Sequence, residues 1–160
     1  MNIRPAEERD IPRMGELLLQ VCRVHHQGRP DLFRDGGRKY SDEELRALLR
    51  DGERPILVAE DEAGWVAGYA FCVFQRHRGE GSLRDLTILY LDDLCVDESC
   101  RGRQVGRALY EAVLELARTS GCYNLTLNVW SCNESAMRFY ERCGMRPQKV
   151  GMEVILPAEK

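Results

Sequence analysis

The 160-residue sequence has no long hydrophobic run, and this absence limits its possible locations. No window of about 18 consecutive apolar residues occurs, so we expect no membrane-spanning segment and no membrane partner. The first ten residues, MNIRPAEERD, are polar and lack the apolar core of a secretory signal. These absences predict a cytoplasmic protein.

A surplus of positive charge is also missing. Lysine and arginine number 23 against 26 aspartate and glutamate residues, which gives a formal charge of −3. Because nucleic-acid binding normally depends on a basic surplus, we expect no nucleic-acid partner. The chain has neither a G-x-x-x-x-G-K-[ST] loop nor a G-x-G-x-x-G fingerprint, so neither of these nucleotide-binding patterns is supported.

The seven cysteines include no C-x-x-C pair. An odd number of unclustered cysteines favours reduced thiols in the cytoplasm over a disulfide framework. Cys22, His25 and His26 lie close together, but no second group of ligands accompanies them. We therefore predict no metal site and interpret this stretch as a helix end followed by a loop.

What the chain does have is a globular composition, with 44% apolar and 31% charged residues. Its length suits a single domain, residues 1–160, with one core. Hydrophobic periodicity and turn signals predict strands at residues 2–5, 55–61, 65–74, 86–96, 123–130 and 149–156. They predict helices at about 10–25, 42–51, 105–120 and 133–144, with Asp10, Ser41 and Asn133 as N-caps. The fold class is therefore α/β (α+β), a mixed sheet covered by helices.

Cationic and glycine residues concentrate between the strand at 86–96 and the following helix. Gly102 and Gly106 allow a ligand to approach the backbone. Arg101, Arg103 and Arg107 add forked donors that suit phosphate oxygens. Because the first amides of a helix lack partners and lie at the positive end of its dipole, this junction predicts a phosphate site.

Two segments resemble the signatures of a known family. VDESCRGRQVGRAL (96–109) is similar to the motif V-x-x-x-x-R-G-x-G-x-G-x-x-L of the GNAT superfamily, the acetyl-CoA-dependent N-acetyltransferases. NESAMRFYERCGM (133–145) resembles its second signature, N-x-x-A-x-x-F-Y-x-x-x-G-[FM]. The resemblance covers essentially the whole chain. It implies the GNAT fold, a mostly antiparallel mixed sheet that splays open between two parallel strands, with helices on both faces.

The same resemblance implies that acetyl-CoA is the acyl donor. Its pyrophosphate would rest on backbone amides at the start of the third helix, and its pantetheine arm would pair with the end of the preceding strand. Asn133 would hydrogen-bond the arm, and Tyr140 would lie near the thioester sulfur. The implied cofactor-binding residues are Leu94, Cys95, Val96, Arg101, Gly102, Arg103, Gln104, Val105, Gly106, Arg107, Ala108, Asn133, Ala136 and Tyr140.

Gln104 departs from the family pattern, which usually has a glycine at this position. If the position needs a positive φ, glutamine costs roughly 1 kcal/mol or more in strain, whereas a helical φ costs little. We expect weaker or slightly displaced phosphate binding, not its loss.

Acyl transfer to an amine requires a base, because an alkylammonium has a pKa near ~10.4. Asp92 and Asp93 are the candidates, and they should face opposite ways unless a bulge intervenes. Resemblance to the polyamine-acetylating branch, which has an acidic pair here, favours Asp92 as base through water and Asp93 as structural or substrate-binding. Tyr140 is the candidate acid, since a phenol pKa near ~10 suits a departing thiolate.

The acceptor pocket is expected between the loop HHQGRPDLFR (25–34) and the last strand. The candidate substrate-binding residues are His25, His26, Asp31, Phe33, Asp92 and Met152. Either histidine is an alternative base because imidazole titrates near neutrality. The mixture of residue types does not specify one acceptor.

We interpret the chain as an enzyme that acetylates a primary amine of a small molecule. One alternative is acetylation of protein N-termini or lysines, which requires an open groove. Another is a non-catalytic acyl-CoA-binding domain, which needs neither Tyr140 nor the two aspartates. Members of the family often dimerise, and the exposed edges of an incomplete sheet are a physical reason to expect a possible homodimer.

Overall fold

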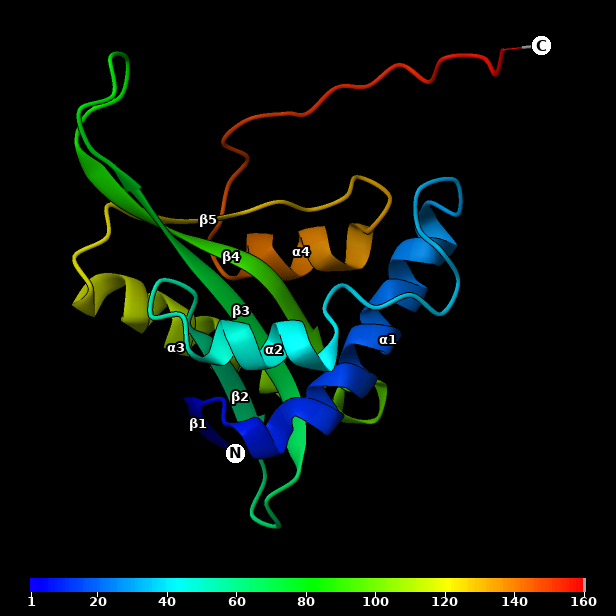
Figure 1. Ribbon diagram of the computed structural model, residues 1–160, viewed down its shortest axis with the longest axis vertical. Coiled ribbons are helices and arrows are strands. Elements are labelled where there is room, and N and C mark those ends of the chain that lie inside the picture. The colour runs from blue at the N-terminus through cyan, green and yellow to red at the C-terminus, as the bar shows by residue number, and fades with distance from the viewer. Residues whose placement is uncertain (160) are drawn as a thin grey trace.

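The computed structural model describes residues 1–159 and contains a five-stranded sheet with helices on both faces (Figure 1). The strands are β1 (Asn2–Pro5), β2 (Ile56–Glu60), β3 (Val66–His77), β4 (Leu86–Val96) and β5 (Asn124–Leu127). The helices are α1 (Ile11–Gly28), α2 (Asp42–Leu49), α3 (Val105–Thr119) and α4 (Glu134–Arg142). Two 3-10 turns, η1 (Glu8–Asp10) and η2 (Glu98–Cys100), precede α1 and α3.

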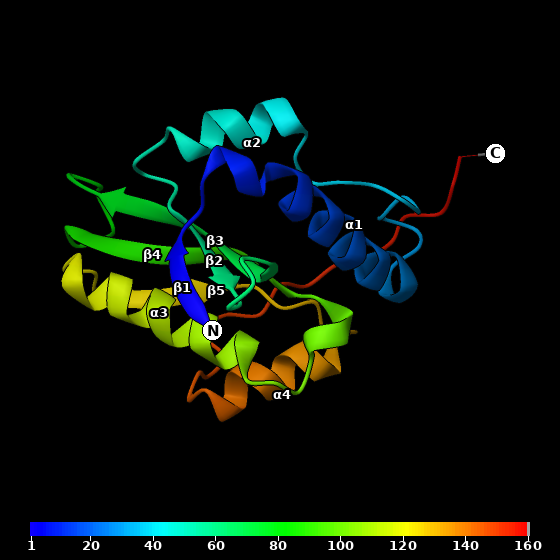
Figure 2. The same ribbon diagram turned by 90° about the horizontal axis from the view of Figure 1, so that it is seen from below.

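The strands lie in the order β1-β2-β3-β4-β5. The first four pair antiparallel with their neighbours, whereas β4 and β5 run parallel. Helices α1 and α2 cover one face of the sheet, and α3 and α4 lie on the other (Figure 2). The predicted fold class, a mixed and mostly antiparallel sheet with helices on both faces, is confirmed.

Each face of the sheet has its own hydrophobic core. The α1-side core joins α1 and α2 to the sheet through Leu17, Leu18 and Leu45, which are fully buried. The α3-side core contains Leu109 and Val113, from the apolar stripe of the third helix. The 3.6-residue spacing read from the sequence therefore faces the sheet as expected.

Local signals set most helix ends. Ser41 and Glu44 form the expected capping box, and the Asn133 side chain accepts a hydrogen bond from the Ala136 amide. The expected N-cap at Asp10 is wrong, because its side chain makes no cap bond to α1. Its carboxylate instead accepts from Arg4 and from the Glu7 amide, which places a 3-10 turn ahead of the helix.

Three element boundaries differ from the sequence expectation. Helix α1 continues past His25 to Gly28, where the Arg29 amide bonds to His25 O and ends the helix. Strand β3 reaches His77 because β4 pairs with it over its whole length. Strand β5 ends at Leu127, where its pairing with β4 stops.

The expected last strand is wrong. Residues 149–156 are extended but belong to no strand, and within residues 1–159 no backbone hydrogen bond involves residues 146–159. The segment leaves the body of the protein after α4 (Figure 1). A strand requires a paired neighbour, and this sequence pattern has none in a single copy of the chain.

A β-bulge at Asp92 changes which face of the sheet β4 presents. Phe71 pairs with Asp93 and Cys72 with Leu91, which leaves Asp92 without a partner in the ladder. Leu91 belongs to the α3-side core and Cys95 to the α1-side core. Odd-numbered side chains therefore change face across the bulge, as an extra residue requires.

Candidate active site

The sheet opens where β4 and β5 stop pairing. Ile88–Leu91 pair with Asn124–Leu127, and the remainder of β4 has no neighbour on that side. A cavity of about 660 Å³ lies beside this end of β4. It is lined by Val21, Val24, Leu94, Cys95, Val96, Cys100, Arg101, Gly102, Gln104, Val105, Gly106, Arg107, Asn133, Ser135, Ala136, Phe139, Tyr140, Arg142 and Cys143. We call it the large cavity.

The loop before α3 presents unpartnered amides to the large cavity. The first intrahelical bond runs from Ala108 N to Gln104 O, at 3.0 Å. Among the described residues, the amides of residues 105–107 therefore have no backbone partner, as at any helix start. Arg101 also lines the cavity and makes no ion pair within residues 1–159, whereas Arg107 pairs with Glu111. This arrangement suits a phosphate group.

The backbone of this loop turns through left-handed conformations. Gly102 has a φ of 78° and Gln104 a φ of 65°. Within the described residues, Gln104 is the only non-glycine residue with a positive φ. The strained alternative considered for this position is therefore the one that the chain adopts.

A polar network holds the loop from beneath. The Asp97 carboxylate accepts hydrogen bonds from Arg13 and Gln20 of α1 and from Ser99. Burial alone would raise its pKa, but the bonds from Ser99, Gln20 and Arg13 hold the pKa of Asp97 well below its usual range. Since Asp97 directly precedes η2, these contacts fix the start of the loop that supplies the free amides.

Helix α4 forms the opposite wall of the large cavity. Asn133 uses its side-chain oxygen for the helix cap, so its amide nitrogen remains available as a donor. Tyr140 packs against Phe139 and Tyr110, with ring centroids 5.0 and 6.3 Å apart. Burial, followed by the charge of Asp93, raises the pKa of Tyr140, so its phenol is protonated at neutral pH.

Both aspartates of β4 receive hydrogen bonds from residues on the α1 side of the sheet. Asp92 accepts from Lys39 Nζ and from Tyr40 Oη, each at 2.8 Å. Asp93 accepts from Tyr69 Oη at 2.8 Å. Burial raises the pKa of Asp93 to about 6. The alternating arrangement is thus replaced by the bulged one, in which both carboxylates lie on one face.

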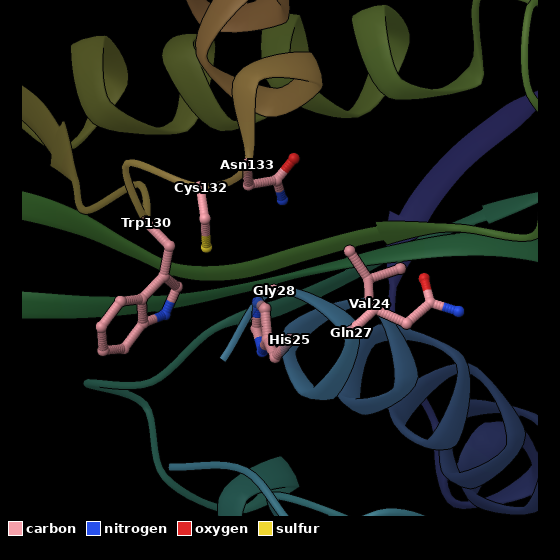
Figure 3. Close-up of a pocket in the computed structure, with 7 residues that line it drawn as sticks. All are labelled: Val24, His25, Gln27, Gly28, Trp130, Cys132 and Asn133. Atoms are coloured by element: carbon pink, nitrogen blue, oxygen red, sulfur yellow. The ribbon is translucent and has the colours of Figure 1, made fainter. Parts of the chain in front are cut away.

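A second, smaller cavity adjoins the first (Figure 3). Its volume is about 280 Å³, and it shares Val24 and Asn133 with the large cavity. The other lining residues are His25, Gln27, Gly28, Trp130 and Cys132, from the end of α1 and the loop after β5. We call it the small cavity.

Aromatic rings form one side of the small cavity. Phe33 contacts His25 and Trp130, with ring centroids 4.9 and 5.5 Å away. Burial, and then the charge of Lys39, lowers the pKa of His25, so this imidazole is neutral at neutral pH. A neutral imidazole beside the cavity can accept a hydrogen bond or a proton.

Other residues expected to contact the acceptor lie outside the small cavity. His26 uses Nδ1 to bond Phe33 O at 2.7 Å, and Asp31 pairs with Arg29 at 2.8 Å. Met152 is 89% exposed and lines neither cavity, because the strand expected to carry it does not form.

The large cavity contains most of the cofactor-binding residues implied by resemblance, with two exceptions. Arg103 and Ala108 do not line it. Conversely, sequence reasoning missed Val21 and Val24, which bring α1 into both walls. Val21 had been assigned to the apolar stripe of α1, and Trp130 to a strand, so neither pattern distinguished a cavity wall from a core.

Within residues 1–159, no group of three or more His, Cys, Asp or Glu side chains is placed to hold a metal ion. None of the described helices combines the length and apolar character required to span a bilayer.

A cradle of free amides beside a splayed sheet, adjoining a second cavity, defines a transferase site for two substrates. Residues 21–145 match the Acetyltransferase (GNAT) family, so the chain belongs to this family. It is an acyltransferase of the N-acetyltransferase type, and the family uses acetyl-CoA.

Two relatives indicate the range of acceptors in the family. Glucosamine 6-phosphate N-acetyltransferase 1 of Oryza sativa subsp. japonica is 33% identical over 152 residues, which cover 94% of this chain and 84% of that protein. Thialysine N-epsilon-acetyltransferase of Bos taurus is 33% identical over 116 residues, or 66% of this chain and 65% of that protein.

Solved structures agree with the fold. A tetramutant of the BH1408 protein from Bacillus halodurans superposes with a TM-score of 0.92 at 31% identity, covering 98% of this chain and 100% of that one. The aminoglycoside N-acetyltransferase AAC(6')-Iy, in complex with CoA, gives a TM-score of 0.71 at 15% identity over 98% of this chain and 100% of that one. The latter likeness concerns the fold alone.

Proposed function

We propose that this protein transfers an acetyl group from acetyl-CoA to a primary amine of a small molecule, by direct attack of the amine on the thioester. The observation that carries the proposal is the pair of adjoining cavities that meet at Val24 and Asn133. The large cavity takes the acyl donor, and the small cavity takes the acceptor. In this proposal residues 1–160 form a single N-acetyltransferase domain.

The residues of the large cavity fit coenzyme A. The amides of residues 105–107, with Arg101 beside them, are the donors for the pyrophosphate. The backbone of Leu94, Cys95 and Val96 faces the opening beside β5 and can pair with the amide groups of the pantetheine arm. When bound, acetyl-CoA supplies the activated acetyl group.

We assign proton acceptance to the aspartate pair, with Asp93 as the better base. The ammonium form of the acceptor must lose a proton before it attacks. Asp92 already accepts from Lys39 and Tyr40, and the positive charge of Lys39 makes this carboxylate a weaker base. Asp93, whose pKa burial raises to about 6, is better matched to neutral pH.

Tyr140 is the proposed acid for the departing thiolate. Its pKa is raised by burial, which keeps the phenol protonated but makes it a weaker acid. The same burial raises the pKa of the Cys95 thiol, in the same cavity, to about 12. A thiolate released beside it meets the same desolvation and becomes a stronger base, so the two groups remain matched.

The small cavity favours a compact acceptor. Its volume of about 280 Å³ is at the lower end of ligand sites, which usually range from about 300 to 1,000 Å³. The loop between α1 and α2 is fixed beside it, because Lys39 and Tyr40 both bond to Asp92. A fixed loop here disfavours a long peptide. The names of the rice and bovine relatives, an amino-sugar and an amino-acid acetyltransferase, also indicate small amines.

A reducing cytoplasm is the proposed location. All seven cysteines are unpaired within the described residues, and three of them are buried. Buried thiols without disulfide partners fit a compartment that keeps them reduced.

The proposal is tested by incubating the protein with acetyl-CoA and a panel of amines, and detecting free thiol. The panel contains amino sugars and their phosphates, amino acids, polyamines and lysine peptides. Thiol release with a small amine, well above the rate with peptides, is the expected result. Preference for a peptide would favour the protein-acetylating alternative, and acetyl-CoA binding without thiol release from any amine would favour the non-catalytic one.

Tyr140→Phe then tests the acid role. Loss of a general acid lowers kcat by about 10²–10⁴-fold, and calorimetry should find the acetyl-CoA affinity nearly unchanged. Tyr123→Phe is the matched control, because this 76% exposed tyrosine lines neither cavity. Equal losses of turnover and affinity in Tyr140→Phe would remove Tyr140 from this role.

A further inference from the structure

The C-terminal segment, residues 149–156, exposes an unusual amount of apolar surface. Five large apolar side chains in it are between 71% and 89% exposed: Val150, Met152, Val154, Ile155 and Leu156. Figures 1 and 2 both show this end of the chain extending beyond the helices and the sheet. Soluble monomers rarely present a contiguous apolar surface of this kind, and such surfaces commonly mark an interaction site.

Two strand patterns in the sequence remain unused in a single copy. The segment at 149–156 has the β-branched, apolar composition of a strand but no partner. The pattern at 123–130 predicts eight residues, yet β5 contains only Asn124–Leu127. β5 is also the last strand of the sheet, so one of its edges has no strand neighbour within residues 1–159. The missing partner of each pattern is a strand.

The segment is held away from β5 of its own copy. Arg29, at the end of α1, donates hydrogen bonds to both carboxylate oxygens of Glu153, at 2.5 and 3.3 Å. The contact ties the middle of the segment to α1. Its apolar side chains on either side of Glu153 therefore face solvent and not the sheet.

We propose that residues 149–156 of one copy pair with the free edge of β5 in a second copy, and that the exchange is reciprocal. The occupant of the exposed β5 edge is thus another molecule of this chain. A two-fold arrangement closes on itself, so both segments and both β5 edges are used and no open edge remains for further growth. The pairing extends β5 toward the eight residues that its sequence predicts.

The apolar area is sufficient for a stable dimer. Fully burying one large apolar side chain removes about 60–120 Å² of surface from water, from its transfer free energy and the free energy per unit area. Ten such side chains, five from each copy, give about 600–1,200 Å² before the backbone edges and flanking residues are counted. Stable interfaces bury a total of about 1,200–2,000 Å².

The proposal is tested first by light scattering during size-exclusion chromatography of the full chain. The wild type is expected to have twice the 18.4 kDa mass of one chain. Ile155→Asp should weaken association at least a hundredfold, because it places a charge in the new interface. Its fold should be unchanged by circular dichroism, since Ile155 is 71% exposed in one copy. Leu83→Asp, in the loop between β3 and β4 and 47% exposed, is the matched control and should leave the dimer intact.

Hydrogen exchange identifies the interface directly. In the wild-type dimer, amides within residues 150–156 and 124–130 should exchange about 100-fold more slowly than in Ile155→Asp. A wild type that remains monomeric at about 100 µM overturns the proposal. A dimer in which residues 150–156 exchange at the rate of an unstructured peptide also overturns it, because association would then use another surface.

Discussion

Replacing Gln104 by glycine is expected to stabilise the protein. Gln104 has a φ of 65°, a left-handed conformation that costs a residue with a Cβ about 1–2 kcal/mol. Its side chain makes no capping hydrogen bond to α3, so the substitution removes no such contact. Glycine adds freedom to the unfolded chain, which offsets about 0.5–1 kcal/mol of the gain. The net increase in unfolding free energy should be about 0.5–1 kcal/mol.

Urea denaturation followed by tryptophan fluorescence measures this gain, and for a chain of this size the melting temperature should rise by about 1–4 °C. Gln104→Ala is the control, because alanine keeps the Cβ and therefore the strain. The affinity for acetyl-CoA should change little in Gln104→Gly, because the loop already adopts this conformation without ligand. If Gln104→Gly is no more stable than Gln104→Ala, backbone strain at this position is not what limits stability.

Two further substitutions test the loop support and the base. Asp97→Asn should lower the unfolding free energy by about 2 kcal/mol, because it weakens hydrogen bonds to charged groups, and should raise KM for acetyl-CoA severalfold with kcat nearly unchanged; a selective fall in kcat would contradict a positioning role. Asp93 has a pKa of about 6 in the folded protein, above its unfolded value, so the native state binds the extra proton between about pH 4 and 6 and stability falls as pH rises through that window, by at most about 1.4 kcal/mol per pH unit. Asp93→Asn should remove this slope in denaturation curves measured across the window, together with the acid limb of the kcat/KM profile near pH 6; an unchanged acid limb would exclude Asp93 as the base.

Local chemistry made much of the fold predictable from the sequence. The stripe of α3, the Ser41 capping box and the Asn133 cap depend on residues within a few positions of one another. The loop before α3 was equally accessible, because free amides, glycines and arginines at a helix start have the same meaning in any fold.

The parts that sequence reasoning missed depend on distant partners. Val24 and Trp130 meet only after α1 and the loop beyond β5 are folded, and no local pattern distinguishes a cavity wall from a buried face. The bulge at Asp92 is visible only in the pairing with β3. The segment at 149–156 has strand composition, but composition does not supply the neighbouring strand that pairing requires.

The single unmatched residue in β4 has a consequence for the chain as a whole. Because side chains alternate in β4, deleting Asp92 would not merely remove one carboxylate but would turn the four following residues inside out. Cys95 would leave the α1-side core, and the backbone groups of residues 94–96 that line the donor channel would exchange edges. A one-residue deletion here should therefore be far more damaging than any substitution at Asp92, since it would reverse the orientation of half of the catalytic wall.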